Sequence, residues 1–477
     1  MGFITSVIDA VNKFVWETPE SFPGMVLLLV GTGIFITFKL GWPQLKRIGH
    51  AINITRGKYD DPKDAGDISH FQALSAALSA TIGIGNIAGV ALAIHYGGPG
   101  ALFWMWVTAI FGTSLKYAEC TLSMKYRMIN PDGSASGGPM YYIEQGLGWK
   151  WLAIVFAAAA AICSFCTGNS IQAFTVADQL NSDFAIPSWV TGVSLAVIVG
   201  LVIIGGIKRI GQVASKLTPF MTVVYLIGGI LILILNADKI PGAFASIFQG
   251  AFTFSGTAGG FAGSAFIMTM VQGIKRGLFS NEAGQGSAPI AHAAAKTTEP
   301  VREGTVAMMG PYIDTIIVCS ITGLAIVVTD AHTAMVNGEL LNSSPMTAYA
   351  FEHGLTFLKG YGGYIVTGSV FLFALSTMIS WSYYGDRSVQ YLFGNSWVMP
   401  YRFVYCIVLF LGAILQLETV WHFGEIALGL MTIPNLIAII ALSGITRRIS
   451  DEYYSRKHMT YAEKIKHHGH GSGVSDN

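Results

Sequence analysis

Residues 79–107 read SATIGIGNIAGVALAIHYGGPGALFWMWV, and the pattern of this stretch decides the fold. An apolar run long enough to enter a bilayer carries Gly83, Gly85 and Asn86 in its middle, and a tight turn follows at 97–100. Glycine weakens a helix, and a backbone that unwinds in lipid needs new partners for its N–H and C=O groups. The stretch therefore predicts a broken membrane helix whose free backbone groups can hold a substrate and an ion. The alternative is that the glycines only let neighbouring helices pack closely.

The composition indicates a membrane protein. Of the 477 residues, 52% are hydrophobic and only 12% are charged, whereas soluble domains carry roughly 25% charged residues. The net charge of +1 provides no field for nucleic acid. The sequence contains no H-E-x-x-H, G-x-S-x-G or P-loop pattern, so we expect neither an enzyme nor an ATP-driven pump, and no cofactor. Cys163 and Cys166 form a C-x-x-C pair without a second pair, which favours helix packing over a metal or redox site.

Apolar runs of about 20 residues mark eleven candidate membrane helices, so the predicted fold class is all-α. The runs cover 22–41, 70–96, 100–125, 148–180, 187–206, 214–236, 255–280, 304–329, 361–391, 399–417 and 420–445. The connections after the odd-numbered spans, together with the C-terminal tail, hold most of the lysines and arginines. By the positive-inside rule, this asymmetry predicts an outer N-terminus, a cytoplasmic C-terminus and a location in the cell membrane.

A second candidate break lies at 265–286, five spans after the first. Because five is odd, the two broken helices run in opposite directions, as in a five-helix inverted repeat with a site at the midplane. The predicted organisation is an outer segment at 1–21, an extra first helix at 22–41, repeats at 70–236 and 255–417, a final helix at 420–445 and a cytoplasmic tail at 446–477. The start of the second repeat falls near 242–255.

Unwinding creates groups of both polarities in one place. The N-terminus of a half-helix carries partial positive charge and suits a carboxylate. Free carbonyls and hydroxyls suit a small hard cation such as Na⁺. One gap can therefore hold a zwitterionic amino acid beside a cation. The stretch 79–86 contains no acidic residue, which favours Na⁺ held by neutral oxygens. A proton that drives transport would need a group elsewhere in the chain.

Three motifs carry a family resemblance. Residues 97–107, GGPGALFWMWV, begin a motif that ends at Gly112 and looks like the signature of the alanine or glycine:cation symporter family. NEAGQGSAP at 281–289 is similar to that family's second hallmark. Residues 79–89 resemble the first helix of the wider leucine-transporter-like fold. The match covers roughly residues 20–450. It implies two inverted five-helix repeats and uptake of small neutral amino acids, chiefly alanine and glycine, driven by Na⁺ or H⁺.

The resemblance also implies a set of site residues. The substrate carboxylate is expected at the backbone amides of Ile84, Gly85 and Asn86. The other expected substrate contacts are Thr81, Ile82, Gln172, Gln272, Gly273, Phe279 and Trp381. The expected Na⁺ ligands are the carbonyls of Ser79 and Ile82 and the hydroxyls of Ser376, Thr377 and Ser380.

Several of these residues have a structural alternative. Ser376 and Ser380 share one helix face, but hydroxyls in membrane helices also bond neighbouring carbonyls without binding a cation. Gln172 suits either a substrate contact or an interhelical hydrogen bond, and Trp381 suits either a gate or the floor of the pocket. Asp314, an intramembrane acid, suits either a cation or proton site or a pairing between helices.

Two classes of transport protein remain. A secondary symporter binds Na⁺ and an amino acid together and exposes them to alternate sides of the membrane. A passive channel is the alternative, although channel filters usually repeat between subunits, whereas both predicted breaks lie within one chain.

Overall fold

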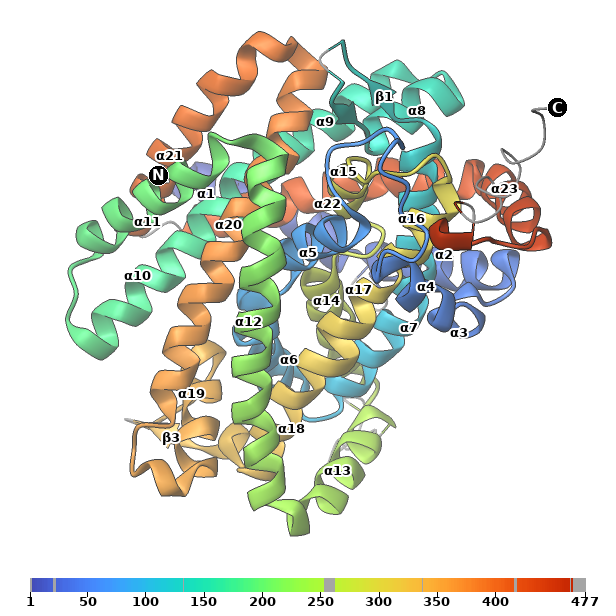
Figure 1. Ribbon diagram of the computed structural model, residues 1–477. Helices are drawn as coiled ribbons and strands as arrows, with labels where there is room; N and C mark the ends of the chain where they lie inside the picture. Colours follow the sequence, from blue (N-terminus) through green and yellow to red (C-terminus); the bar gives the residue numbers. More distant parts are fainter. Residues whose placement is uncertain are drawn as a thin grey trace, which may run out of the picture.

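The computed structural model describes residues 2–19, 23–131, 133–252, 262–336, 338–415, 418–463 and 465, and it is a bundle of long helices (Figure 1). Two short antiparallel hairpins, β1–β2 (Met128–Ile129 and Ala135–Ser136) and β3–β4 (Met335–Val336 and Glu339–Leu340), lie in loops. The all-α prediction is therefore confirmed for the described residues.

The predicted break in the opening stretch is present. Helix α5 (His70–Thr81) starts with a capping box, in which Ser69 and Gln72 satisfy each other's backbone N–H groups. It ends at Ile82, a single turn η1 (Ile84–Asn86) follows, and α6 (Ala88–Gly97) completes the span. The turn at 97–100 then leads into α7 (Ala101–Lys125).

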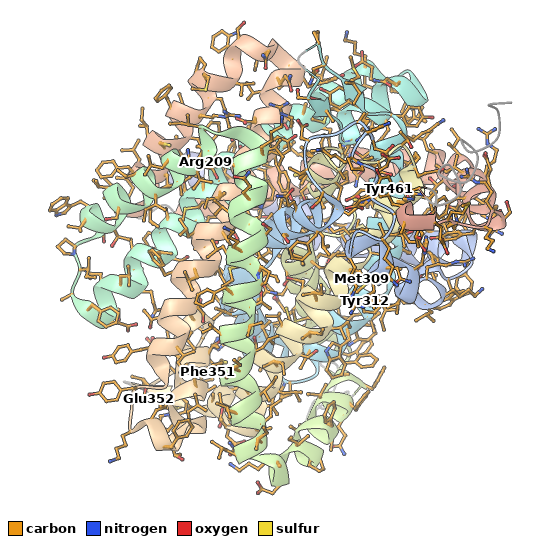
Figure 2. All side chains as sticks on the ribbon, in the orientation of Figure 1. Arg209, Met309, Tyr312, Phe351, Glu352 and Tyr461 are labelled. Carbon is orange, nitrogen blue, oxygen red and sulfur yellow. The ribbon has the colours of Figure 1, made fainter. Side chains whose placement is uncertain are left out.

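The rest of the first half follows the predicted spans with one difference. After α8 (Pro139–Leu147), the fourth span consists of α9 (Lys150–Phe165), a π-helical segment η2 (Cys166–Ser170) and α10 (Ile171–Phe184). Helix α11 (Ser188–Ile203) and α12 (Gly206–Leu235) complete it. Helix α12 begins eight residues before the predicted 214, because the polar segment with Lys208 and Arg209 belongs to the same helix. Arg209 lies near one end of α12, and Phe351 lies beside the helix further toward its other end (Figure 2).

The second half begins with α13 (Ile240–Phe252) and α14 (Ala262–Asn281). The short α15 (Ala288–His292) precedes a span built from α16 (Pro300–Ala307), α17 (Met309–Pro311), the π-helical η4 (Tyr312–Cys319) and α18 (Ser320–Val328). Then come α19 (Ser343–Gly354), α20 (Gly363–Phe393), α21 (Val398–Ile414), α22 (Glu418–Ala441) and α23 (Ser443–Ser455). Helix α22 ends at Ala441, before the predicted end at 445, and α23 begins at Ser443.

The second break is confined to the end of the predicted stretch. Helix α14 is continuous through Asn281, and the chain unwinds only at 282–287, where Glu282, Gly284 and Gly286 have φ values of 53°, 78° and 83°. Two glycines in the left-handed region make this turn possible at low cost. Lys275 lies inside α14 and pairs with Glu425 of α22 at 3.4 Å, so it does not mark a side of the membrane.

The N-terminal helices pack on the outside of this core. Helix α1 (Gly2–Glu17) contacts α22, and α2 (Gly24–Leu40) contacts α7. Helix α2 ends at Gly41, whose positive φ of 72° closes it, before the short α3 (Pro43–Lys46) and α4 (Ile48–Thr55).

Six helical stretches of the described chain are long and apolar enough to cross a membrane: Lys150–Phe184, Gly206–Leu235, Pro300–Val328, Gly363–Phe393, Asn395–Ile414 and Phe423–Ala441. Helices α2, α6 and α11 are apolar but shorter. Large apolar side chains such as Trp189, Val223 and Phe403 are more than half exposed on α11, α12 and α21, as expected of surfaces that face lipid.

The loops at one end of the bundle interlock, and we call this the basic end: residues 41–69, 126–149, 282–299 and 443–463. Arg127 joins three of its segments by donating hydrogen bonds to the carbonyls of Ala65 (2.9 Å), Ala295 (2.7 Å) and Thr297 (2.6 Å). Helix α13 and the β3–β4 hairpin lie at the opposite end (Figure 1).

Candidate functional site

The first break exposes backbone donors inside the bundle. Gly83 N–H donates to the Asn86 side-chain oxygen at 2.9 Å, and Ile82 N–H still donates to Leu78 at 2.7 Å. The N–H groups of Ile84 and Gly85 have no acceptor among the described residues, although both residues are buried. Two unpaired, buried N–H groups can donate hydrogen bonds to an anionic group. This is where the sequence predicted a carboxylate.

Asn86 connects this break to the eighth span. Its side-chain NH₂ donates to a carboxylate oxygen of Asp314 at 2.6 Å and to Cys319 at 3.3 Å. The other carboxylate oxygen of Asp314 accepts from the hydroxyls of Ser280 (2.9 Å) and Thr315 (2.7 Å). Asp314 is fully buried, so the structural alternative, pairing between helices, is present in this conformation. The π-helical turn of η4 places Asp314 and Cys319 toward Asn86, as is common for π-bulges at functional sites.

Helix α20 crosses α5 just before the break and brings neutral oxygens together. Ser79 and Ser376 exchange hydrogen bonds from side chain to carbonyl, at 2.9 and 3.1 Å. Thr377 Oγ1 lies 3.3 Å from the carbonyl oxygens of both Ser79 and Ala80. A β-carbon at Gly83 would lie only 2.6 Å from the same Thr377 oxygen. Hard cations prefer such oxygen ligands. The described residues contain no cluster of His, Cys, Asp and Glu with the geometry of a metal site.

Ser380 lies one turn further along α20, and its hydroxyl is buried without a partner in the described structure. The predicted cation ligands Ser79, Ser376 and Thr377 are thus in mutual contact, with Ser380 beside them on the same face. Ile82 is fully buried at the end of α5.

The fourth span supplies an unpaired polar atom that faces the break. Gln172 donates through its side-chain nitrogen to Thr167 O at 3.1 Å, a carbonyl within the π-helical η2. Its side-chain oxygen is buried and has no partner among the described residues. This oxygen would lie 3.8 Å from a β-carbon on Gly83, so it points at the unwound segment. A free carbonyl oxygen is a suitable acceptor for an ammonium group.

Trp381 packs directly on Gly168 of η2. A β-carbon at Gly168 would lie 2.4 Å from the Trp381 side chain, so only glycine fits there. The indole N–H donates to Glu282 at 3.0 Å, and Glu282 also accepts a hydrogen bond from Ser287. Trp381 therefore connects the fourth span to the second break.

Of the site residues predicted in the seventh span, only Phe279 lies beside the first break. The Phe279 ring and Ser280 lie against Gly85, within 3.4 Å of where its β-carbon would be. Gly273 instead faces α7, where a β-carbon would meet Ala101 O at 2.3 Å, and Gln272 lies beside Gly97 at the far end of α6. These two residues were predicted at a break, but they belong to the continuous part of α14 and do not adjoin Gly85. Thr81 is buried, and its hydroxyl lies 3.3 Å from Ala77 O of its own helix.

A second cluster, which no sequence pattern indicates, lies at the basic end. Glu303 of α16 accepts hydrogen bonds from both His70 of α5 and His292 of α15, the latter at 2.5 Å. All three side chains are at most 1% exposed. We call this His–Glu–His cluster the latch, because it joins the helix that precedes the first break to the helix that follows the second. No sequence motif unites its members, since 233 positions separate His70 from Glu303.

Comparison with known proteins places this geometry among transporters. The family model described as the sodium:alanine symporter family matches residues 1–467. The chain is 45% identical over 449 residues to the sodium/alanine symporter AgcS of Methanococcus maripaludis, covering 93% of this chain and 96% of that protein. It is 35% identical to a putative sodium/proton-dependent alanine carrier protein, YrbD, of Bacillus subtilis, covering 91% of this chain and 90% of that protein.

The fold is similar to that of solved transporters at low sequence identity. The structure of MhsT in complex with L-phenylalanine superimposes with a TM-score of 0.56 at 13% identity, and the match covers 79% of this chain and 89% of that chain. At this identity the likeness concerns the fold alone.

Proposed function

This chain belongs to the sodium:alanine symporter family and is a sodium-coupled secondary transporter rather than an enzyme or a channel; from that premise we propose that it imports alanine and glycine through the first break. The observation that carries the proposal is the pair of unpaired N–H groups at Ile84 and Gly85, in the same unwound segment as Gly83, whose β-carbon position lies 3.8 Å from the unpaired oxygen of Gln172. They offer opposite polarities to the two ends of one zwitterion. The Phe279 ring lies beside Gly85, 3.4 Å from where a β-carbon on that glycine would be, so it is the candidate wall for the substrate side chain.

We propose that Na⁺ binds where α5 and α20 cross. The proposed ligands are the carbonyls of Ser79 and Ile82 and the hydroxyls of Ser376, Thr377 and Ser380. Hydrogen bonds between Ser79, Ser376 and Thr377 support the proposal, because they bring the Ser79 carbonyl next to two of these hydroxyls. Na⁺ would replace these hydrogen bonds and fix α5 to α20. A bound cation beside the break favours a bound carboxylate, which is the reciprocal coupling that symport requires. H⁺ coupling, for which Asp314 is the candidate group, is the second possibility.

We propose that the basic end faces the cytoplasm and that the chain has eleven spans, with α2 as the extra first helix and the C-terminus inside. The excess of lysine and arginine in the loops of that end supports this orientation. The latch then closes the inner side in the present conformation, and inward release requires Glu303 to part from at least one histidine.

The test is uptake of [¹⁴C]alanine by proteoliposomes that contain the purified full chain. We expect saturable uptake with an inward Na⁺ gradient, inhibition by excess unlabelled glycine, and background uptake when K⁺ replaces Na⁺. An inward proton gradient in K⁺ buffer is the arm for H⁺ coupling. Equal uptake in Na⁺ and K⁺ without a proton gradient would refute sodium coupling, and failure of glycine to compete would remove glycine as a substrate.

Gly83 and Gly89 form a matched pair on the broken helix. We expect Gly83→Ala to reduce Na⁺-driven uptake by about tenfold or more, because its methyl group would lie 2.6 Å from Thr377 Oγ1, and overpacking of this kind costs about 1–3 kcal/mol. Gly89→Ala should retain uptake, since nothing lies within 4 Å of its β-carbon. Initial rates of the two variants at equal protein content provide the measurement, and equal loss in both would contradict the assignment of the site to Gly83.

A further inference from the structure

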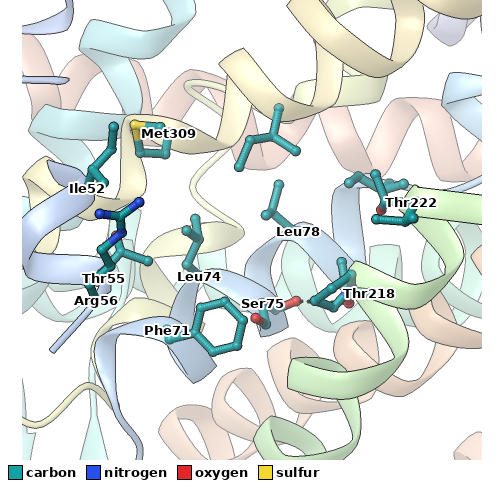
Figure 3. Close-up of a pocket in the computed structure, with 14 residues that line it drawn as sticks. Ile52, Thr55, Arg56, Phe71, Leu74, Ser75, Leu78, Thr218, Thr222 and Met309 are labelled. Atoms are coloured by element: carbon teal, nitrogen blue, oxygen red, sulfur yellow. Dashed lines mark hydrogen bonds between the residues drawn. The ribbon is translucent and has the colours of Figure 1, made fainter. Parts of the chain in front are cut away.

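A large apolar pocket opens beside the broken helix and touches the site described above only at Ile82. It has a volume of about 650 Å³ and lies between α4, α5, α12 and the segment 309–313 (Figure 3). Phe71, Leu74, Leu78 and Ile82 line it from the α5 side. Pockets of about 300–1,000 Å³ are the usual size for small ligands in proteins.

The pocket faces lipid rather than the aqueous loops. Phe71 is 42% exposed and Val223 is 53% exposed at its walls, which would be costly in water for two large apolar side chains. Along α5 the lining runs from Phe71 to the end of the helix at Ile82. At 1.5 Å per residue this distance is about 16 Å, close to half of a hydrocarbon core about 30 Å thick. The pocket therefore has the length of one acyl chain in one leaflet.

A single charge stands at the end of the pocket next to the basic end. Arg56 follows α4, and its side chain is exposed and lines the pocket beside Thr55 and Ile52 (Figure 3). Within the described chain its guanidinium has no hydrogen bond or ion pair. Two other polar groups of the lining are hydrogen-bonded within the protein: Thr55 donates to Ala51 O at 2.9 Å and Thr218 to Ser75 O at 3.3 Å. The Thr222 hydroxyl, on the α12 wall, has no partner within the described chain. An unpaired arginine at the level of the headgroups is a phosphate-binding group.

We propose that this pocket binds an anionic phospholipid, with one acyl chain along α5 and the lipid phosphate on Arg56. The apolar lining and its half-bilayer length fit the chain, and the positive charge at its end selects the headgroup. Because Phe71, Leu74 and Leu78 line the pocket from α5, the bound chain packs against the helix that ends at the first break. The inference concerns binding and does not depend on which amino acid is transported.

The headgroup is tested by native mass spectrometry of the delipidated full chain, titrated with dioleoyl phosphatidylglycerol or dioleoyl phosphatidylcholine. We expect wild type to bind the anionic lipid about fivefold more tightly, the preference that one arginine provides near a membrane surface. Arg56→Gln should bring the ratio to about one. The control Arg448→Gln, which removes an exposed arginine of α23, should keep it. No preference in wild type, or an unchanged preference in Arg56→Gln, would overturn the assignment.

The position of the acyl chain in the pocket is tested by a substitution on the exposed α12 wall that fills the pocket. Val223→Trp places a bulky ring in the pocket, and we expect it to reduce the bound phosphatidylglycerol several-fold. Val224→Trp is the matched control, since Val224 is the next residue of α12, is 39% exposed and does not line the pocket. Undiminished binding in Val223→Trp, or equal loss in both variants, would show that the lipid binds elsewhere. Both positions are exposed, so neither substitution disturbs the core.

Discussion

Asn86→Ala is expected to lower Na⁺-driven alanine uptake by about 100-fold or more. The Asn86 side chain holds both sides of the break: its oxygen accepts from Gly83 N–H, and its nitrogen donates to Asp314. Alanine removes both bonds at once in a place that water does not reach. An unsatisfied buried group costs about 1–3 kcal/mol, and more if it is charged, so the two losses together cost about 2–6 kcal/mol, a range that includes the roughly 2.7 kcal/mol corresponding to 100-fold.

The measurement compares Asn86→Ala with Asn181→Ala in the same proteoliposomes. Asn181 is exposed and caps the end of α10 by donating to Ile186 O at 3.0 Å, so its loss should leave uptake within about twofold of wild type. Free alanine, added as the substrate in Na⁺ buffer, should also raise the melting temperature of wild type and leave that of Asn86→Ala unchanged. This comparison separates loss of substrate binding from loss of folded protein. Near-normal uptake by Asn86→Ala would show that the break does not need this side chain.

Glu303→Gln is expected to open the basic end. Both carboxylate oxygens of Glu303 accept from histidines, whereas glutamine offers only one acceptor and presents an NH₂ group to the other ring. Loss of one charge-assisted hydrogen bond is worth about 1.5–3 kcal/mol, which corresponds to a population of the open state about 10- to 100-fold higher.

Cys120 provides a native reporter of that opening. It is fully buried and packs with Ala77 of α5, Ala288 of α15 and Ala307 of α16, the three helices that the latch joins. In a chain whose other four cysteines are replaced by serine, we expect Glu303→Gln to increase the rate of maleimide labelling of Cys120 at least tenfold.

The control for this experiment is Glu299→Gln. Glu299 belongs to the same segment but pairs with Arg456 at the surface, at 3.0 Å, and surface pairs contribute at most about 1 kcal/mol. Labelling should therefore stay near the rate of the parent chain. A latch that does not hold the inner side closed would give equal labelling in Glu303→Gln and Glu299→Gln.

The sequence predicted the first break because its signal is local. Gly83, Gly85 and Asn86 lie within four positions, and the structure unwinds there, with Asn86 bonded back to Gly83. The oxygens of α5 and α20 were also predictable as a set, because the residue types and the resemblance point to the same helix faces. Their roles toward substrate and Na⁺ stay proposals.

The second break was located too broadly because apolar periodicity does not show where within a long span the backbone unwinds. The positive φ values at Glu282, Gly284 and Gly286 decide the position, and this leaves Gln272 and Gly273 in an intact helix.

Three features could not be predicted from local pattern. The π-helical turns at 166–170 and 312–319 depend on tertiary packing around Trp381 and Asn86. The latch unites helices from both halves of the chain. The lipid pocket exists only because α4 and α12 stand on either side of α5 and leave its outer face uncovered between them.

The most direct test of the account is whether each ligand drives the other. Proteoliposomes with the purified chain are loaded with K⁺ buffer, and ²²Na⁺ influx is measured with and without an inward gradient of alanine. The account predicts that alanine drives saturable ²²Na⁺ entry, that this entry is lost in Asn86→Ala, and that it rises and falls with alanine uptake at a fixed ratio. Sodium entry that is independent of alanine, or alanine entry that moves no sodium and no protons, would contradict symport through this site.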